Sequence, residues 1–157
     1  MSEPSWVPRA AAARARVAAA GDDSGTLMVV DRVIADLHLA EADRASLRAA
    51  LADLDPDRAA AELKNALRSR LDPTAEDTAL IATMRRRHDT VSTMANRLEE
   101  LEGHIDATLV DLDLLVARIH ERTLDRSPNK QSLADELERL RIDSIALAEA
   151  HRELDRM

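Results

Sequence analysis

A seven-residue apolar repeat through the middle of the chain most limits what the protein can fold into. No proline follows Pro73 before Leu124, and apolar residues recur at regular intervals of three, four and seven residues over this stretch. Six of them lie one heptad apart, and three more each follow one of these six by three residues: Met84, Val91, Leu98, Ile105, Leu112 and Ile119, with Met94, Leu101 and Leu115. These are the a and d positions of a coiled coil. The sequence therefore predicts one long helix over Asp72 to Leu124.

The composition favours helices elsewhere too. Phe and Tyr are absent and Trp6 is the only aromatic residue, so the core must be built from aliphatic side chains and Met. Three Gly and five Pro leave few places to break a helix in 157 residues. Good helix formers dominate the rest of the sequence, which predicts an all-α protein.

The first 24 residues are predicted to form a flexible N-terminal arm that contains an Ala/Arg-rich helix. Pro4 and Pro8 disfavour helix at its beginning, whereas Pro8 to Ala20 has high helix propensity but little apolar surface. For Trp6 we expect packing against its own chain, or disorder, rather than docking to a partner. Arg9, Arg14 and Arg16 meet no acidic residue within this helix.

Residues 25–71 are predicted to form a small head of short helices. Apolar spacing indicates helices over Thr26 to His38, Glu41 to Leu54 and Ala59 to Leu71. The pair Asp55 and Pro56 offers an N-cap and a first-turn proline, which predicts that a helix begins there.

Residues 72–157 are predicted to form a helical hairpin. Ser127 and Pro128 again supply a cap and a first-turn proline, and a short connection makes neighbouring helices antiparallel. In the last helix Leu133, Leu140 and Leu147 repeat one heptad apart. The predicted fold is an all-α, elongated helical bundle with a long central helix, an antiparallel coiled-coil hairpin at its C-terminal end and a small N-terminal helical head.

The hairpin alone leaves apolar residues without cover. Between Leu109 and Ile119 the long helix is apolar nearly all round, so it must be buried on more than one side. Either the head folds against this end or a second copy of the chain does, and we favour the second copy. The predicted protein-interaction residues are Val91, Met94, Leu98, Leu101, Ile105, Leu109, Val110, Leu112, Leu114, Leu115, Val116, Ile119, Ile142 and Ile145.

Charge and composition exclude several functions. A formal net charge of −8 argues against general nucleic-acid binding, which needs a basic surface. Cysteine is absent, and no apolar run approaches the roughly 20 residues that span a bilayer. Neither paired Glu-x-x-His motifs nor a carboxylate in an apolar cleft is evident. We expect a cytoplasmic protein without cofactor, metal, enzymatic activity or small-molecule substrate.

The leading hypothesis is therefore a non-enzymatic coiled-coil protein–protein interaction module, such as an adaptor, scaffold or assembly subunit, that self-associates. The alternative rests on the cluster Arg85, Arg86 and Arg87, together with the N-terminal arginines. Three successive arginines could bind an anionic surface, either lipid at a membrane periphery or nucleic acid. The simpler interpretation is a solvated helix segment in which Arg87 pairs with an acidic residue across the seam.

Overall fold

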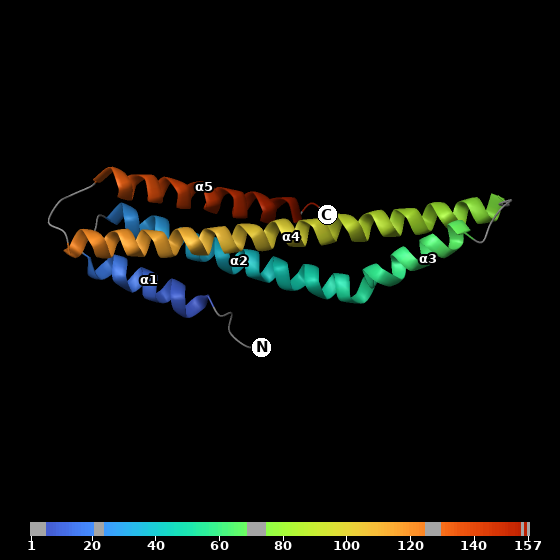
Figure 1. Ribbon diagram of the computed structural model, residues 1–157, viewed down its shortest axis with the longest axis horizontal. Helices are drawn as coiled ribbons and strands as arrows, with labels where there is room; N and C mark the ends of the chain where they lie inside the picture. The colour runs from blue at the N-terminus through green and yellow to red at the C-terminus, as the bar shows by residue number, and fades with distance from the viewer. Residues whose placement is uncertain (1–5, 21–23, 69–74, 125–129, 155, 157) are drawn as a thin grey trace. The chain divides into compact units, whose positions relative to one another are not determined.

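In a computed structural model the chain is an all-α helical bundle. The structure describes residues 6–20, 24–68, 75–124, 130–154 and 156. Within these residues there are five α-helices and no strand (Figure 1). The helices are α1 (Val7–Ala19), α2 (Ser24–Leu54), α3 (Pro56–Arg68), α4 (Ala75–Leu124) and α5 (Lys130–Leu154). The predicted fold class is thus confirmed as all-α. Coiled-coil packing stays a prediction, and both the predicted helix start at Asp72 and the predicted cap at Ser127 lie outside the described residues.

Helix α4 confirms the single long helix that the apolar repeat predicts. It runs without interruption for 50 residues. Gly103 is its one interior glycine, and a Cβ added there would meet no atom within 4 Å. The repeat therefore continues past Gly103 because this position faces away from the packed side of the helix.

Helix α2 corrects the predicted head. The sequence indicated two helices separated between His38 and Glu41, whereas α2 is continuous for 31 residues. Neither glycine nor proline interrupts residues 26–54, and Leu39 and Ala40 are good helix formers. The buried positions also continue across the expected break, at Val30, Val33, Leu37, Ala40, Leu47 and Leu51.

Asp55 ends α2 and begins α3, as the sequence predicts. Its backbone has φ of 47°, in the left-handed region, and its N–H donates to the carbonyl of Leu51 at 3.1 Å. Its side-chain Oδ1 accepts the N–H of Arg58, also at 3.1 Å, which caps α3. Aspartate suits both tasks because it tolerates this conformation and is a favoured N-cap.

The helices form two compact units. The first consists of residues 1–43 and 101–157, and the second of residues 44–100. Helices α2 and α4 each contribute to both units. The predicted division into 1–24, 25–71 and 72–157 concerns domains rather than such packing units, and it stays a prediction.

In the first unit α1 packs antiparallel to α2. The ring centroids of Trp6 and His38 lie 4.7 Å apart, and Arg14 Nε donates to Asp31 Oδ1 at 2.6 Å. Residues later in α1 thus meet residues earlier in α2. Only 4% of the Trp6 surface is exposed. Trp6 therefore packs against its own chain, which is one of the two outcomes that the sequence predicts. The alanine-rich helix is formed, and its buried residues are Ala10, Ala13 and Val17.

Helices α4 and α5 run antiparallel in the same unit, as predicted from their short connection. Asp143 of α5 lies beside Asp111 of α4. The hydrogen bond from Arg118 to Glu121 mainly raises the pKa of Arg118, and the nearby charge of Glu136 on α5 raises it further. Arg118 and Glu136 lie seven residues later on α4 and seven earlier on α5. Figure 1 shows α5 along one side of this part of α4 and α1 along the other.

The second unit contains the end of α2, all of α3 and the first part of α4. Its buried apolar residues are Leu47, Leu51, Ala59 and Val91. Arg87 of α4 joins all three helices: its Nη2 donates to the carbonyl of Leu54 at 3.1 Å, and its Nη1 lies 3.4 Å from Glu62 Oε2. None of the described helices is both long enough and apolar enough to cross a membrane.

Candidate functional site

Most of the predicted interaction residues build the core. The structure buries them between the chain's own helices, with Met94 and Leu98 half-buried. Their apolar character therefore reflects folding in the first place, and changing them would test the fold rather than a surface. The fully buried members are Val91, Leu101, Ile105, Leu109, Leu112, Leu115, Val116 and Ile119.

The apolar end of α4 obtains its cover from this chain. We favour a second copy over the head of residues 25–71 as the additional cover for this end, yet Leu109 and Val116 are only 8% exposed in the single chain. Val116 faces Arg16, Ala19 and Ala20 across a cavity, so α1 lies on this flank of α4. Helix α1 thus helps to cover Val116 despite its thin alanine face, and cover of the rest of this end by a second copy stays a prediction.

Six large apolar residues described in the first unit are exposed: Met28 and Leu39 lie on α2, and the other four lie on α4 and α5. Val110 and Leu114 of α4 are 56% and 39% exposed, and Ile142 and Ile145 of α5 are 57% and 56% exposed. They project away from the buried stripe of each helix. The Asp111–Asp143 contact places all four along the same length of the antiparallel pair. We call Val110, Leu114, Ile142 and Ile145 the outer apolar residues.

Charged side chains around the outer apolar residues are largely paired within the chain. Arg139 lies 3.6 Å from Glu136, and Arg141 lies 3.6 Å from Glu138. On α4, Asp113 forms an ion pair with Arg9 of α1. Positive and negative side chains near the outer apolar residues therefore largely offset one another, although the whole chain carries a net charge of −8.

Asp111 and Asp143 form a carboxyl pair between α4 and α5. Burial, followed by the hydrogen bond and the like charge of Asp111, raises the pKa of Asp143 to about 6, and His104 opposes this shift. Oδ2 of Asp143 is buried without a hydrogen-bond partner. A proton on Asp143 lets one carboxyl donate to the other, so this contact is most favourable in acid.

Two further polar pairs lie between α2 and α5. Ser144 donates a hydrogen bond to Asp36, and Nδ1 of His151 lies 2.6 Å from Asp43 Oδ2. From the first pair to the second, the position rises by seven residues on both α2 and α5, so the two helices run parallel. These two pairs were not predicted from the sequence. The heptad spacing of Asp36 and Asp43 on the apolar side of α2 was the available signal.

The predicted anion-binding arginines are not equivalent. Arg87 is engaged with Leu54 and Glu62, which agrees with the interpretation that it pairs across the seam. Arg86 contacts the hydroxyl of Thr83 at 3.5 Å and, like Arg85, is exposed without a described acidic partner. A cavity of about 450 Å³ lies beside them, lined by Leu54, Thr83, Arg86, Arg87, Thr90 and Val91.

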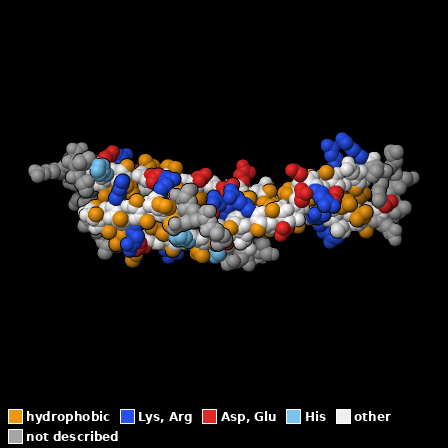
Figure 2. Space-filling view, turned by 90° about the horizontal axis from the view of Figure 1, so that it is seen from below, with side chains coloured by type: hydrophobic (Ala, Val, Ile, Leu, Met, Phe, Trp, Pro, Cys, Tyr) orange, Lys and Arg blue, Asp and Glu red, His pale blue; other side chains and the backbone are white. Residues whose placement is uncertain are grey.

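The N-terminal arginines are mostly paired, contrary to their isolation in the sequence. Arg9 pairs with Asp113 and Arg14 with Asp31. Among the described residues no acidic side chain forms an ion pair with Arg16. On the face shown in Figure 2, Lys and Arg side chains are interspersed with Asp and Glu rather than gathered in one basic patch.

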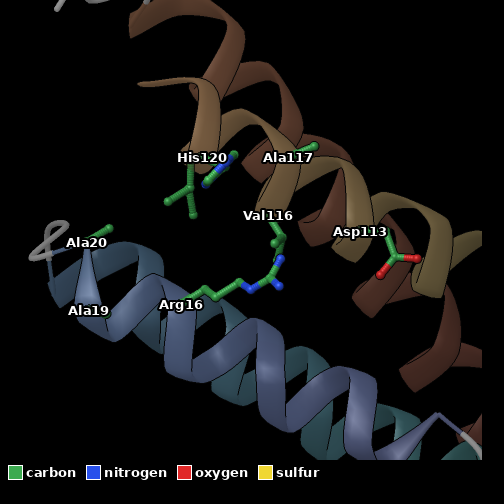
Figure 3. Close-up of a pocket in the computed structure, with 8 residues that line it drawn as sticks. Arg16, Ala19, Ala20, Asp113, Val116, Ala117 and His120 are labelled. Carbon is green, nitrogen blue, oxygen red and sulfur yellow. The ribbon is translucent and has the colours of Figure 1, made fainter. Parts of the chain in front are cut away.

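Arg16 extends into a cavity of about 660 Å³ between α1 and α4. In Figure 3 its side chain reaches from α1 to α4, where the guanidinium lies beside Val116. His120 follows one turn further along α4, and Asp113 marks the opposite end. The sequence did not reveal this cavity because its residues come from segments about 100 positions apart. Its apolar lining consists of Ala19, Ala20, Val116, Ala117 and Ile119.

Comparisons with known proteins add no relative. Neither a protein-family model, nor a curated protein, nor a solved structure matches this chain. Within the part of the chain that the structure describes, no group of three or more His, Cys, Asp or Glu residues is arranged to hold a metal ion. The function must therefore be argued from the surfaces of the bundle itself.

Proposed function

We propose that this chain is a non-enzymatic protein-interaction module that self-associates through the outer apolar residues. The observation that carries the proposal is the exposure of four large aliphatic side chains, each 39–57% exposed, along the same length of two adjacent helices. Scattered apolar residues are normal on a protein surface, whereas a gathered set marks an interaction site.

A second copy of the chain suits this surface for two reasons. Aliphatic faces are self-complementary, so the same patch can serve both partners of a two-fold symmetric dimer. The neighbouring charges are also already paired, as Arg139 is with Glu136 and Arg141 with Glu138, so a copy meets little local like-charge repulsion. Such a module would act as a scaffold or assembly subunit.

The test is the mass in solution, measured by light scattering, of the wild type and of a Leu114→Glu, Ile142→Glu double variant. Both positions are exposed, so the variant should fold with unchanged helix content. We expect the wild type to exceed the 17.3 kDa of one chain with rising concentration and the double variant to stay monomeric. Two charges placed in a desolvated apolar interface oppose its formation.

Met28→Glu is the matched control. Met28 lies in the first unit and is 71% exposed, but it is on α2 and outside the outer apolar residues. This variant should keep the mass of the wild type. A wild-type chain that stays a strict monomer over a wide concentration range would reject self-association.

The alternative, a regulator that binds an anionic surface through Arg85–Arg87, has weaker support. Arg87 is engaged within the second unit, and Arg9 and Arg14 are paired in the first. Binding to anionic vesicles that falls steeply with salt and disappears in an Arg85→Ala, Arg86→Ala variant would favour this alternative. Absence of binding at about 50 mM salt would eliminate it.

A further inference from the structure

We propose that the cavity between α1 and α4 binds an aliphatic carboxylate, with Arg16 holding the carboxylate and the apolar lining holding the chain. This site is separate from the outer apolar residues and does not depend on self-association. Its volume of about 660 Å³ falls within the roughly 300–1,000 Å³ of small-molecule sites.

The lining supplies the apolar half of the site. Val116 and Ile119 are 8% and 4% exposed and form the floor of the cavity on α4, whereas the other lining residues are exposed. Ala19, Ala20 and Ala117 complete the lining with side chains too short to fill the space between the helices. An aliphatic chain placed here would leave water and contact methyl groups, which is favourable in proportion to the apolar area covered.

Arg16 supplies the charged half. Its guanidinium is the cation within the lining that no described acidic side chain pairs, and it lies over the apolar floor beside Val116 (Figure 3). Guanidinium groups bind carboxylates through two parallel hydrogen bonds. His120 lies on the same side of the cavity.

The other charge in the lining does not oppose a carboxylate strongly. Asp113 is negative, but Arg9 forms an ion pair with it from the neighbouring turns of α1. The C-terminal end of α1 contributes a partial negative charge, and Arg16 in its last turn is placed to offset it. Among the described residues, Arg16 together with the Arg9–Asp113 ion pair leaves one positive charge at the cavity.

Octanoate and octan-1-ol are the probes, titrated into the full chain while amide NMR signals are recorded. We expect both to shift signals of Ala19, Ala117 and His120, with octanoate binding about tenfold more tightly because of its charged hydrogen bonds. Arg16→Gln should remove this preference and leave the binding of octan-1-ol unchanged. Ala117→Leu, which fills the cavity with a good helix former, should weaken both.

Arg85→Gln is the matched control, since Arg85 is also an exposed arginine without a described acidic partner but lies in the second unit. It should keep the preference for octanoate. The proposal is overturned if octanoate leaves the cavity signals unchanged at millimolar concentration, or if Arg16→Gln keeps the preference. A short acidic, leucine-rich peptide that shifts these signals where octanoate does not would also overturn it and indicate a protein partner instead.

Discussion

The two units share the residue types of one helical repeat but bury them to different degrees. In the first unit Leu101, Leu112 and Leu115 of α4 are 0–1% exposed, whereas in the second unit Leu98 and Met94 are only half-buried. Three other helix segments, from α1, α2 and α5, accompany the repeat in the first unit, and two, from α2 and α3, accompany it in the second. The repeat thus indicates which residues face other helices. The number of neighbouring helices determines how far these residues are buried from solvent.

The largest effect should come from truncating leucines in the two cores. Leu115→Ala in the first unit should lower the free energy of unfolding by about 3 kcal/mol, because this site is fully enclosed and cannot collapse around the cavity. Leu51→Ala in the second unit, where Leu51 is 9% exposed, should cost about 2 kcal/mol. Urea unfolding followed by circular dichroism measures both. If Leu51→Ala lowered the free energy of unfolding by more than Leu115→Ala, the second unit and not the first would have the more tightly packed core.

The turn at Asp55 tests the second unit at its helix junction. Asp55→Ala removes the cap of α3 and places alanine at φ of 47°, so we expect a loss of about 1.5 kcal/mol. Asp55→Asn is the matched control, because asparagine also caps helices and tolerates this conformation. Thermal unfolding of the two variants separates them. Equal losses would show that neither the cap nor the backbone conformation matters.

The Asp111–Asp143 pair gives the first unit a pH dependence. The pKa of Asp143 is raised from 3.8 to about 6 on folding, so the folded state holds the proton more tightly and stability falls as pH rises between these values. Asp143→Asn should therefore stabilise the protein at pH 7 by about 1 kcal/mol, a figure reduced for solvent screening, and give no gain at pH 3. Urea unfolding at pH 7 and pH 3 measures the stability gained by Asp143→Asn. An equal gain at both pH values would contradict the predicted pH dependence.

The smallest effect concerns Gly103 in the first unit. Gly103→Ala should stabilise α4 by about 0.5 kcal/mol, since the added Cβ meets no atom within 4 Å and alanine is the better helix former. A rise in the thermal midpoint would agree with an outward position. A fall would mean that Gly103 packs against another chain.

The sequence predicted the long helix, the direction of α5 and the junction at Asp55, because each depends on local spacing or on one short connection. It missed the continuity of α2, because the apolar stripe of this helix shifts gradually around its surface and resembles the stripes of two separate helices. It also missed the pairing of Arg9 with Asp113, which joins residues 104 positions apart. The outer apolar residues were named, but so were buried neighbours such as Leu112. Periodicity alone does not separate a core face from an exposed one when a helix is apolar nearly all round.

The central claim is that the outer apolar residues of the first unit, and not the exposed apolar residues of the second, contact another copy of the chain. Methyl NMR spectra recorded from dilute to concentrated protein test it directly. We expect the signals of Val110, Leu114, Ile142 and Ile145 to shift with concentration. Those of Leu67 and Leu80 in the second unit, which are 47% and 45% exposed, should stay constant. Constant signals at the outer apolar residues, or shifts confined to Leu67 and Leu80, would contradict the proposed interface.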